Sequence, residues 1–485
     1  MQRSANRISR VVGLAAVMMI AGCTVGPRYQ APTPPTVTAY TPQPLPAETE
    51  SSSGANGSAQ HFNPTAAIPS DWWTAFQSPE LNAMVAQALK NSPTLEQATA
   101  RLKQAHEDVI ARTGATKYPT VTGNASATEE QLNLAAFGIP FPNPSPFTLL
   151  NGSVAVSYAL DVWGANRRAI EGLKAQRDYE GWQLEGARLM LAGNVVAAAI
   201  RQAQIREQIE VTKQLLAVEQ KELKITEERE QAGGVSDFDV RSQRTLVAQT
   251  EAAIPPLELQ ADILNDQLAV LMGLSPAEAH VERISLDALH LPEELPLTVP
   301  SELVQQRPDT RAAEALLHEA SANVGVATAN EFPQIVLTGS AGGSGTRFNS
   351  GGDVWNVGAA LAAPIFNGGA LQAEKRKAED AYDEAASAFR GTVLESFREV
   401  ADALYMTERD AETLKARSAA AGEAEGAYGI AAKRYQAGGI SEASLLDAER
   451  QRLQTALDQE NAAASRLTDS ATLFEALGGK SAPSI

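Results

Sequence analysis

Few residues in this chain of 485 amino acids could perform covalent chemistry. Cysteine occurs once, at Cys23, and no stretch has the glycine spacing of a phosphate-binding loop or the pattern of a nucleophile beside a base. The histidines are widely scattered and none has metal-ligand spacing: His61, His106, His280, His290 and His318. We therefore predict a protein that is not an enzyme, has no metal site and binds no cofactor.

The N-terminus has the layout of a bacterial secretory signal peptide that ends at a lipid-modified cysteine. Three arginines among the first ten residues precede an apolar stretch, Val11–Ile20, and Ile20–Cys23 matches the lipobox. We predict a signal peptide at 1–22 and a diacylglycerol on the thiol of Cys23. The alternatives are a plain signal peptide that contains a cysteine and an uncleaved anchor, but the apolar stretch is short for a membrane span.

The charge of the mature chain excludes one class of partner. Loss of the three arginines with the signal peptide lowers the formal net charge from −18 to −21. Such a surface repels nucleic acid, so no nucleic-acid partner is expected. No apolar run approaches the ~20 residues of a membrane-spanning helix. If the protein crosses a membrane, we expect it to do so as strands.

The chain contains an internal duplication. Arg229–Ser236 matches Arg434–Ser441 at an offset of 205 residues, and Leu160–Gly164 corresponds to Pro364–Gly368 at an offset of 204. Each copy is predicted to contain a helix, two strands, a very long helix, a Gly-Gly turn and a return helix. We divide the chain into a signal peptide (1–22), a lipidated N-terminus and extended linker (23–70), a first repeat (71–285), a second repeat (286–479) and a tail (480–485).

The predicted strands alternate between apolar and small or polar residues. Val154, Val156, Tyr158 and Leu160 share one face of Ser153–Asp161, and Trp355, Val357, Ala359 and Leu361 do the same in the second repeat. This alternation suits a barrel strand with lipid outside and water inside; a strand of a soluble sandwich is the alternative. With partner strands at 120–126 and 334–341, each chain has four. Because four strands cannot close a membrane barrel, we expect subunits to share it.

The long proline-free stretches before each Gly-Gly turn carry two apolar rows. Ile209, Leu216 and Leu223 form one seven-residue row, and Val211, Val218 and Ile225 form another about 200° away around a helix. The second repeat has the same kind of spacing at Val393, Phe397, Val400 and Leu404. Apolar rows on two sides predict a neighbouring helix on each side, as in a ring of helices, although an ordinary bundle core is the alternative.

Three blocks of the sequence are informative: Cys23–Pro32, Asp71–Phe76, and Arg434–Gly439 followed by Leu445–Glu449. Together they resemble the outer-membrane factor family typified by TolC, and specifically its lipoprotein, NodT-type efflux branch. Cys23–Pro32 is similar to the N-terminal block of that branch, in which the lipidated cysteine is followed by Val-Gly-Pro and Tyr. Asp71–Phe76 resembles the next block, and Arg434–Gly439 followed by Leu445–Glu449 resembles the turn at the periplasmic tip. The resemblance extends over residues 23–479.

This resemblance implies the fold class and the location. We expect a mainly α-helical, internally duplicated chain with a small membrane β-barrel. Three chains would form a homotrimer whose twelve-stranded β-barrel continues into a long periplasmic α-helical barrel. The protein would be anchored by lipid in the outer membrane and extend into the periplasm. The partners implied are a periplasmic adaptor (membrane fusion) protein, docked at the turns with Gly233, Gly234, Gly438 and Gly439, and an inner-membrane pump of the RND type.

The resemblance also implies a pore gate. The position that matches Asp447 lines the pore of the family as a ring of carboxylates, which would favour cations. Two departures weaken this assignment, because Ala443 stands where close relatives have a bulky apolar residue, and Ser242 is the equivalent of Asp447 in the first repeat. The alternative is a solvated carboxylate paired with Arg450, three residues further along the helix.

The function implied is the exit duct of a tripartite efflux pump, which exports drugs or other small molecules passively through the outer membrane. Two alternatives stay open. The same tube could serve as the outer-membrane exit of a type I protein-secretion system. A periplasmic coiled-coil scaffold lipoprotein without a pore is the third hypothesis, which the alternating strands disfavour.

Overall fold

The computed structural model describes residues 24–479, except 65, 67, 134–137, 139, 141, 143, 279–280 and 348–350. The predicted signal peptide, Cys23 and the tail 480–485 therefore lie outside the described residues. Within the described residues, no helix is both long enough and apolar enough to cross a membrane.

The chain forms two compact units, and each draws segments from both predicted repeats. Unit 1 contains the described part of Met1–Pro32 together with Arg101–Glu180 and Ala312–Phe389. Unit 2 contains Thr33–Ala100, Gly181–Arg311 and the described part of Arg390–Ile485.

The order helix, two strands, long helix and return helix occurs twice, as the sequence predicts. Both long helices, α4 and α8, have 67 residues. The elements of the first copy are α2 (Pro79–Asn91), α3 (Pro93–Lys117), β2 (Thr120–Glu130), β3 (Phe147–Leu160), α4 (Ala165–Gln231) and α5 (Asp237–Leu271). Those of the second are α6 (Pro300–Gln306), α7 (Pro308–Ala329), β5 (Gln334–Gly345), β6 (Gly352–Ala362), α8 (Ala370–Gln436) and α9 (Glu442–Leu477). Short elements are β1 (His61–Asn63), η1 (Trp72–Phe76), η3 (Leu286–Ala288) and β4 (Glu294–Pro296).

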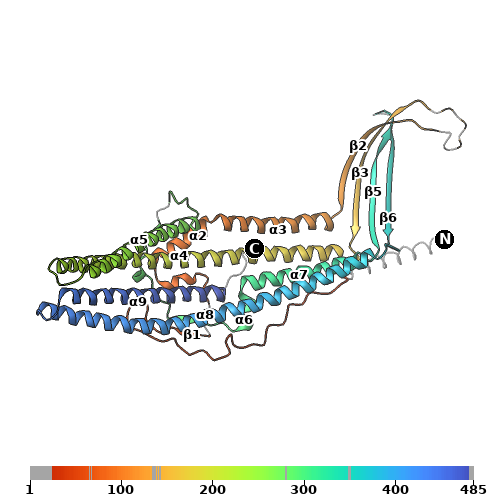
Figure 1. The fold of residues 1–485 in the computed structure, drawn as a ribbon. Coiled ribbons are helices and arrows are strands. Elements are labelled where there is room, and N and C mark those ends of the chain that lie inside the picture. Colours follow the sequence, from red (N-terminus) through yellow and green to blue (C-terminus); the bar gives the residue numbers. More distant parts are fainter. Residues whose placement is uncertain are drawn as a thin grey trace. The chain divides into compact units, whose positions relative to one another are not determined.

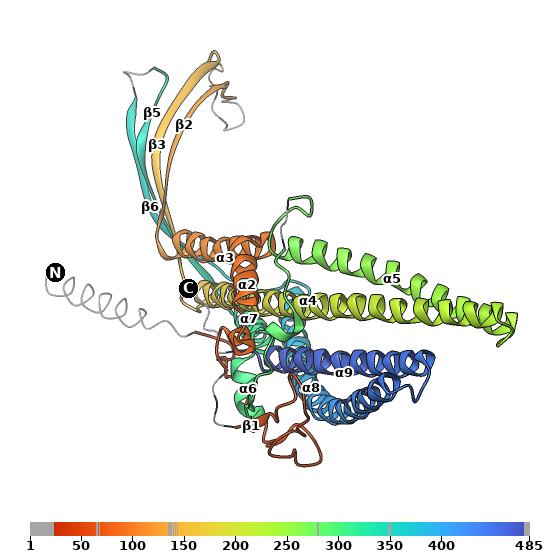
Figure 2. The ribbon, with the colours of Figure 1, turned by 90° about the vertical axis from the view of Figure 1, so that its left-hand side faces the viewer.

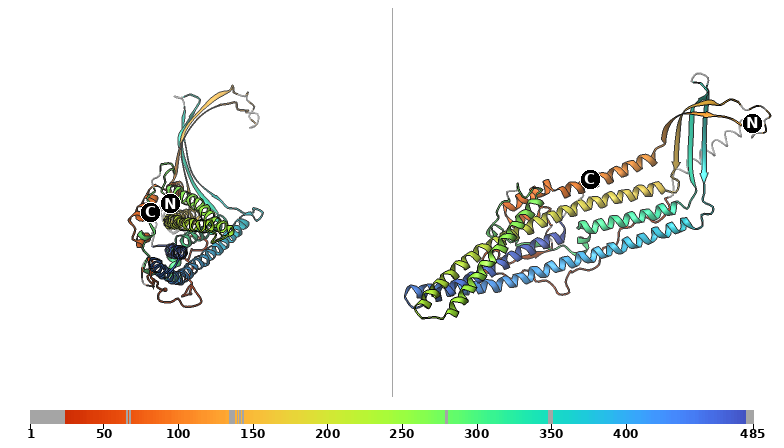
Figure 3. Two further views of the ribbon diagram at one scale, coloured as in Figure 1. Left: turned by 60° about the vertical axis from the view of Figure 1, so that its left-hand side comes forward. Right: turned by 45° about the horizontal axis from the view of Figure 1, so that its top comes forward.

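Unit 1 contains an antiparallel four-stranded sheet in the order β2-β3-β5-β6 (Figure 1). The strands curve along their length (Figures 2 and 3). Ser157 lies opposite Thr120 and Thr338, whereas Val156 lies opposite Val121 and Gly339. Residues opposite one another in a sheet point to the same face. This register therefore gathers small or polar residues on one face and apolar residues on the other. The strands β2 and β6 each pair on one side only.

The two faces of the sheet differ in polarity, as the alternation predicts. On one face Asn356 donates a hydrogen bond from Nδ2 to Ser340 Oγ, 2.8 Å away. The side chains of this face include Thr120, Thr122, Asn124, Ser126, Asn151, Ser153, Ser157, Thr338, Ser340 and Asn356. The opposite face includes Val121, Val154, Val156, Tyr158, Leu160, Ile335, Leu337, Trp355, Val357 and Leu361. Trp355 and Val357 are 75% and 81% exposed, so the apolar face is uncovered in the single chain.

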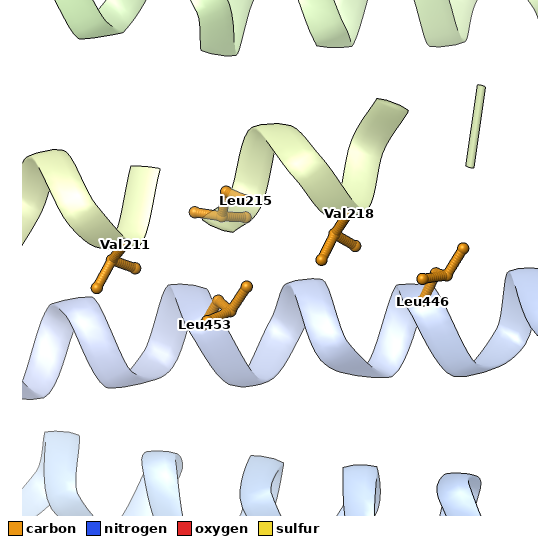
Figure 4. Packing of buried hydrophobic residues seen from close by; sticks show 5 residues of the cluster. All are labelled: Val211, Leu215, Val218, Leu446 and Leu453. Atoms are coloured by element: carbon orange, nitrogen blue, oxygen red, sulfur yellow. The ribbon is translucent and has the colours of Figure 1, made fainter. Parts of the chain in front are cut away.

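Unit 2 contains α5, α9 and most of α4 and α8, from Gly181 and Arg390 onward, which form the helical hairpins α4–α5 and α8–α9 (Figures 1 and 2). One side of α4 packs against α9, with Val211, Leu215 and Val218 of α4 interleaved with Leu446 and Leu453 (Figure 4). The partly buried Ile225 and Leu457 extend this contact.

Another side of α4 packs against the return helix α5. Ile205 and Ile209 contact Ala261 and Leu264 there. The prediction of a neighbouring helix on two sides of α4 is therefore confirmed for Ile209 and for the row of Val211, Val218 and Ile225.

The polar N-terminal segment is held against α9 in unit 2. Arg466, whose side chain is fully buried, donates hydrogen bonds to Thr49 Oγ1 (3.1 Å), Gln60 Oε1 (3.2 Å) and the carbonyl oxygens of Asn56 and Ser58 (3.0 and 3.1 Å). Burial lowers the pKa of Arg466 to about 10, so the guanidinium is still charged at neutral pH. Polar composition predicts a linker without its own core, and the bonds to Arg466 take the place of such a core.

The α4–α9 contact generates a stability prediction. Leu453 is 3% exposed, so Leu453→Ala removes buried methyl groups and leaves a cavity. We expect the free energy of unfolding to fall by about 2–5 kcal/mol, measured by chemical denaturation in detergent with circular dichroism. Leu132, which is 42% exposed after β2, gives the matched control Leu132→Ala, with a change within about 0.5 kcal/mol. Equal losses in the two variants would contradict the assigned packing.

Candidate functional site at the hairpin tips

The two Gly-Gly turns at the hairpin tips have the same hydrogen bonds. In the first, Gly234 N donates to Arg229 O (2.7 Å) and Gly233 N to Glu230 O (2.8 Å). In the second, Gly439 N donates to Arg434 O (2.7 Å) and Gly438 N to Tyr435 O (2.9 Å). These pairs of bonds form a Schellman motif, which satisfies the last carbonyl groups of α4 and α8.

Glycine is required at one position of each turn. Gly233 and Gly438 have φ of +73° and +70°, the left-handed region that L-residues with a side chain rarely adopt. The next helix starts three residues later in both copies, where Ser236 and Ser441 are the N-caps. The duplicated sequence thus encodes two rigid, nearly identical reversals of the chain.

The helices after the turns differ in their capping. Ser236 Oγ accepts from Asp239 N, and Asp239 Oδ2 accepts from Ser236 N at 2.8 Å, which completes a capping box. These hydrogen bonds lower the pKa of Asp239 below its ordinary value. In the second copy Ser441 Oγ accepts from Ser444 N (3.2 Å) and lies 3.0 Å from the Ser444 hydroxyl, but residue 444 has no carboxylate that could accept from the backbone N–H of Ser441.

Asp447 is an exposed carboxylate in the second turn of α9. Its side chain is 68% exposed, and its Oδ1 accepts a hydrogen bond from Arg450 Nη2 at 2.6 Å. This is the pairing that the alternative interpretation predicts, and it occurs within one helix. Ala443 lies one helical turn earlier and is partly buried, whereas Ser242 is exposed on α5. Asp447 and Ser242 therefore belong to different hairpins.

A further carboxylate from α4 joins Asp447 and Arg450. Gln243 Nε2 of α5 donates to Glu222 Oε2 (3.1 Å) and to the backbone oxygen of Glu219 (3.3 Å). Burial raises the pKa of Glu222, the negative charges of Asp447 and Glu219 add to this, and Arg450 and the bond from Gln243 oppose it. Three helices thus contribute to one charged cluster near the tips.

Sequence reasoning missed both Glu222 and Phe238. Glu222 follows Val218 by four residues, so a carboxylate on the apolar side of α4 was the available signal. Phe238 is 75% exposed at the start of α5, and the 205-residue offset makes it the counterpart of Ala443. The bulky apolar residue absent at Ala443 is therefore present in the other hairpin.

The described part of the chain contains no group of three or more His, Cys, Asp or Glu residues that could hold a metal ion. His280 lies outside the described residues. His318 Nε2 lies 3.0 Å from Glu171 Oε1 in unit 1.

Comparison with solved structures identifies the class of protein. The structure of the outer-membrane channel OprN is similar to this one, with a TM-score of 0.82 and 27% sequence identity. The match covers 94% of this chain and 99% of the OprN chain. The fold, with its sheet and paired helical hairpins, therefore defines a mostly helical outer-membrane channel protein.

Comparison of sequences gives the family. The family described as outer membrane efflux protein matches residues 84–274 and 299–479. The chain belongs to this family. The pyoverdine export outer membrane protein OpmQ of Pseudomonas putida is 31% identical over 421 residues, covering 84% of this chain and 87% of OpmQ. The toluene efflux pump outer membrane protein TtgI of Pseudomonas putida is 28% identical over 476 residues, covering 96% of this chain and 97% of TtgI.

These comparisons confirm the resemblance predicted from the sequence blocks. The protein is an outer-membrane efflux channel protein, and the scaffold hypothesis without a pore loses its basis. Its relatives are channel proteins of the outer membrane rather than enzymes.

The tip geometry generates a matched pair of glycine predictions. Gly438→Ala places a Cβ at φ +70°, so we expect it to lower the free energy of unfolding by about 1–2 kcal/mol. Gly422, inside α8 with open space at its Cβ position, is the control. Gly422→Ala improves helix propensity, and we expect a gain of about 0.5–1 kcal/mol. Thermal melts of both variants measure the difference, and a gain in both would show that the turn imposes no left-handed geometry.

Proposed function

We propose that this chain is the exit duct of a tripartite pump that exports drugs or other small molecules passively across the outer membrane. The observation that carries the proposal is the sheet of unit 1, with one apolar face, one polar face and two unpaired edges. An apolar outer face suits lipid and a polar inner face suits a water-filled lumen. The names of OpmQ and TtgI, which refer to pyoverdine export and toluene efflux, support small-molecule cargo.

We further propose a homotrimer. Strand edges cannot be left open in lipid, and four strands are too few to close a barrel. Pairing of β6 in one chain with β2 in the next would close a twelve-stranded barrel from three chains, continued by a periplasmic α-helical barrel. Exposed apolar side chains on α5 support a helical neighbour from another subunit: Leu259, Ile263 and Val270 are 55–60% exposed.

The lipid anchor on Cys23 is part of the proposal, and the start of the described chain supports it. Val25 N donates a hydrogen bond to Trp163 O at 3.1 Å, three residues after β3 ends at Leu160. Residue 25 is thereby fixed beside the point where the apolar face of the strand ends. An acyl chain on Cys23, two residues earlier, would start at the level of the membrane that the strands enter.

At the tips, we assign the inner end of the duct to the charged cluster and the adaptor contact to the turns. A ring of Asp447 from three chains would favour cations at the constriction, with Arg450 and Glu222 modulating its charge. Ala443 leaves room there, and Phe238, beside Ser242 in the other hairpin, supplies the apolar surface. The rigid turns at Gly233, Gly234, Gly438 and Gly439 would present the same geometry twice to a periplasmic adaptor that joins an inner-membrane pump.

The function is tested by accumulation of a fluorescent pump substrate in host cells that contain the matching pump and adaptor. Deletion of the gene is expected to raise intracellular dye several-fold, and re-expression from a plasmid is expected to restore export. Unchanged accumulation with several dyes, together with a lost secreted protein, would support the type I secretion channel instead.

The pore assignment is tested by ion selectivity in planar bilayers. Asp447→Ala removes three carboxylates from the proposed ring, so we expect the preference for cations to fall and the reversal potential in a salt gradient to move toward zero. Glu423→Ala, an exposed carboxylate within α8, makes the same change in net charge elsewhere. Identical reversal potentials for wild type and Asp447→Ala would show that Asp447 does not line the pore.

A further inference from the structure

The helix ends that adjoin the sheet of unit 1 are rich in basic residues. Six of them form what we call the basic collar: Arg112, Lys117, Arg167, Lys375, Arg376 and Lys377. All lie close in sequence to a strand end, since Lys117 precedes β2 by three residues and Lys377 is the eighth residue of α8. A helix rises 1.5 Å per residue, so the collar lies within roughly 12 Å of the helix ends.

Side-chain contacts tie these helix ends together in the order of the strands. Arg112 Nη2 donates to Asn166 Oδ1 at 3.1 Å, which joins α3 to α4. Trp163 Nε1 donates to Pro333 O at 2.8 Å, and its ring stacks on Phe332, which joins the start of α4 to the end of α7. Lys375 Nζ lies 3.7 Å from Glu331 Oε2, which joins α8 to α7. The ends of α3, α4, α7 and α8 that carry or adjoin the collar are thus connected by side-chain contacts, and Figure 3 shows these helices meeting the strands of the sheet.

Nearby carboxylates do not cancel the collar. Asp161 pairs with Arg167 at 3.3 Å and caps the start of α4 through the backbone N–H of Asn166. The two ion pairs to lysines, Glu331 with Lys375 and Glu374 with Lys377, are both long, at 3.7 Å. Lys117 lies over the ring of Tyr118, 6.0 Å from its centroid, and Arg376 is exposed. A positive excess here contrasts with the net charge of −18 of the whole chain.

The opposite end of the sheet carries more acidic than basic residues. Glu129 and Glu130 end β2, and Asp353 lies at the start of β6, with Arg347 the cation in the described part of the β5–β6 connection. Among the described residues next to the strands, the basic ones therefore gather at the helix end, and Arg347 is the exception at the opposite end. A membrane-spanning sheet with this polarity would place its cations at one surface of the bilayer.

We propose that the basic collar binds the phosphate groups of anionic phospholipids in the periplasmic leaflet of the outer membrane. The inference rests on the proposed function, because it needs the sheet to span that membrane. The headgroup layer is about 5–8 Å thick on each side of the hydrocarbon, so long Lys and Arg side chains next to the strand ends reach it. Each such charge strengthens attachment to an anionic surface, and phosphate is an anion that guanidinium and ammonium groups both bind.

The test uses the full-length trimer reconstituted in nanodiscs of phosphatidylcholine with or without phosphatidylglycerol. The collar variant combines Lys117→Gln, Arg376→Gln and Lys377→Gln, and the matched control combines Lys90→Gln, Lys221→Gln and Lys224→Gln, which are exposed elsewhere. Native mass spectrometry counts the lipids that stay bound. We expect wild type and control to retain phosphatidylglycerol over phosphatidylcholine, and the collar variant to lose about tenfold or more of that preference. Added salt should weaken the preference as well.

The outcomes separate the collar from the proposed function. If the wild type inserts in both kinds of nanodisc but shows no preference for phosphatidylglycerol, the proposed lipid binding by the collar is wrong and the membrane-spanning sheet is unaffected. An acidic protein surface would then be the partner of the collar. Displacement of bound phosphatidylglycerol by inorganic phosphate at low concentration would show an unspecific anion site and would also overturn it. Failure of wild type to insert in either bilayer would overturn the membrane-spanning sheet and the collar with it.

Discussion

An open strand edge cannot face hydrocarbon, because free N–H and C=O groups there have neither water nor protein as partners. The sheet of unit 1 has two such edges, at β2 and β6, and an uncovered apolar face. One chain therefore cannot complete its own membrane structure. Duplication contributes two strand pairs to each chain, and the proposed trimer supplies the remaining neighbours. The apolar rows on two sides of α4 fit this arrangement, since α4 lies between α5 and α9.

Basic and acidic residues are concentrated in different parts of the chain. Basic residues gather beside the strands, while carboxylates such as Glu222 and Asp447 gather near the hairpin tips. Burial of Glu222 among like charges raises its pKa, whereas exposed Asp447 is paired with Arg450. A passive duct has no catalytic group to position, so its specificity depends on charge and size at constrictions.

The sequence predicted the features that repeat with a fixed period. Alternation in β3 assigned Val154 and Val156 to one face, and the seven-residue row of Val211 and Val218 indicated a partner that proves to be α9. Such patterns can be recognised in a sequence because the same kind of apolar residue recurs at the same spacing many times.

Single polar contacts between segments far apart in the chain have no period and could not be predicted. The partners of Arg466 lie about 410 residues away in the chain, so nothing local to either segment indicates them. The bond from Gln243 to Glu222 has no period either, although Glu222 itself could have been noticed as a carboxylate on the apolar side of α4. Cys23 lies outside the described residues, so its lipid stays a proposal that rests on the lipobox and on the bond from Val25 to Trp163.

The difference in capping between the two hairpins has a mechanical consequence. Asp239 accepts a hydrogen bond from the backbone N–H of Ser236 at the start of α5, whereas the Ser444 side chain contacts only the hydroxyl of Ser441, 3.0 Å away, at the start of α9. Fraying of the first turn of α9 therefore breaks one capping hydrogen bond fewer than fraying of the first turn of α5, so we expect it to need less free energy. Protonation of Asp239 would remove this difference, and because its pKa is lowered, that happens only in acid. At neutral pH the start of α9, the helix that bears Asp447, is therefore held by fewer capping hydrogen bonds than the start of α5.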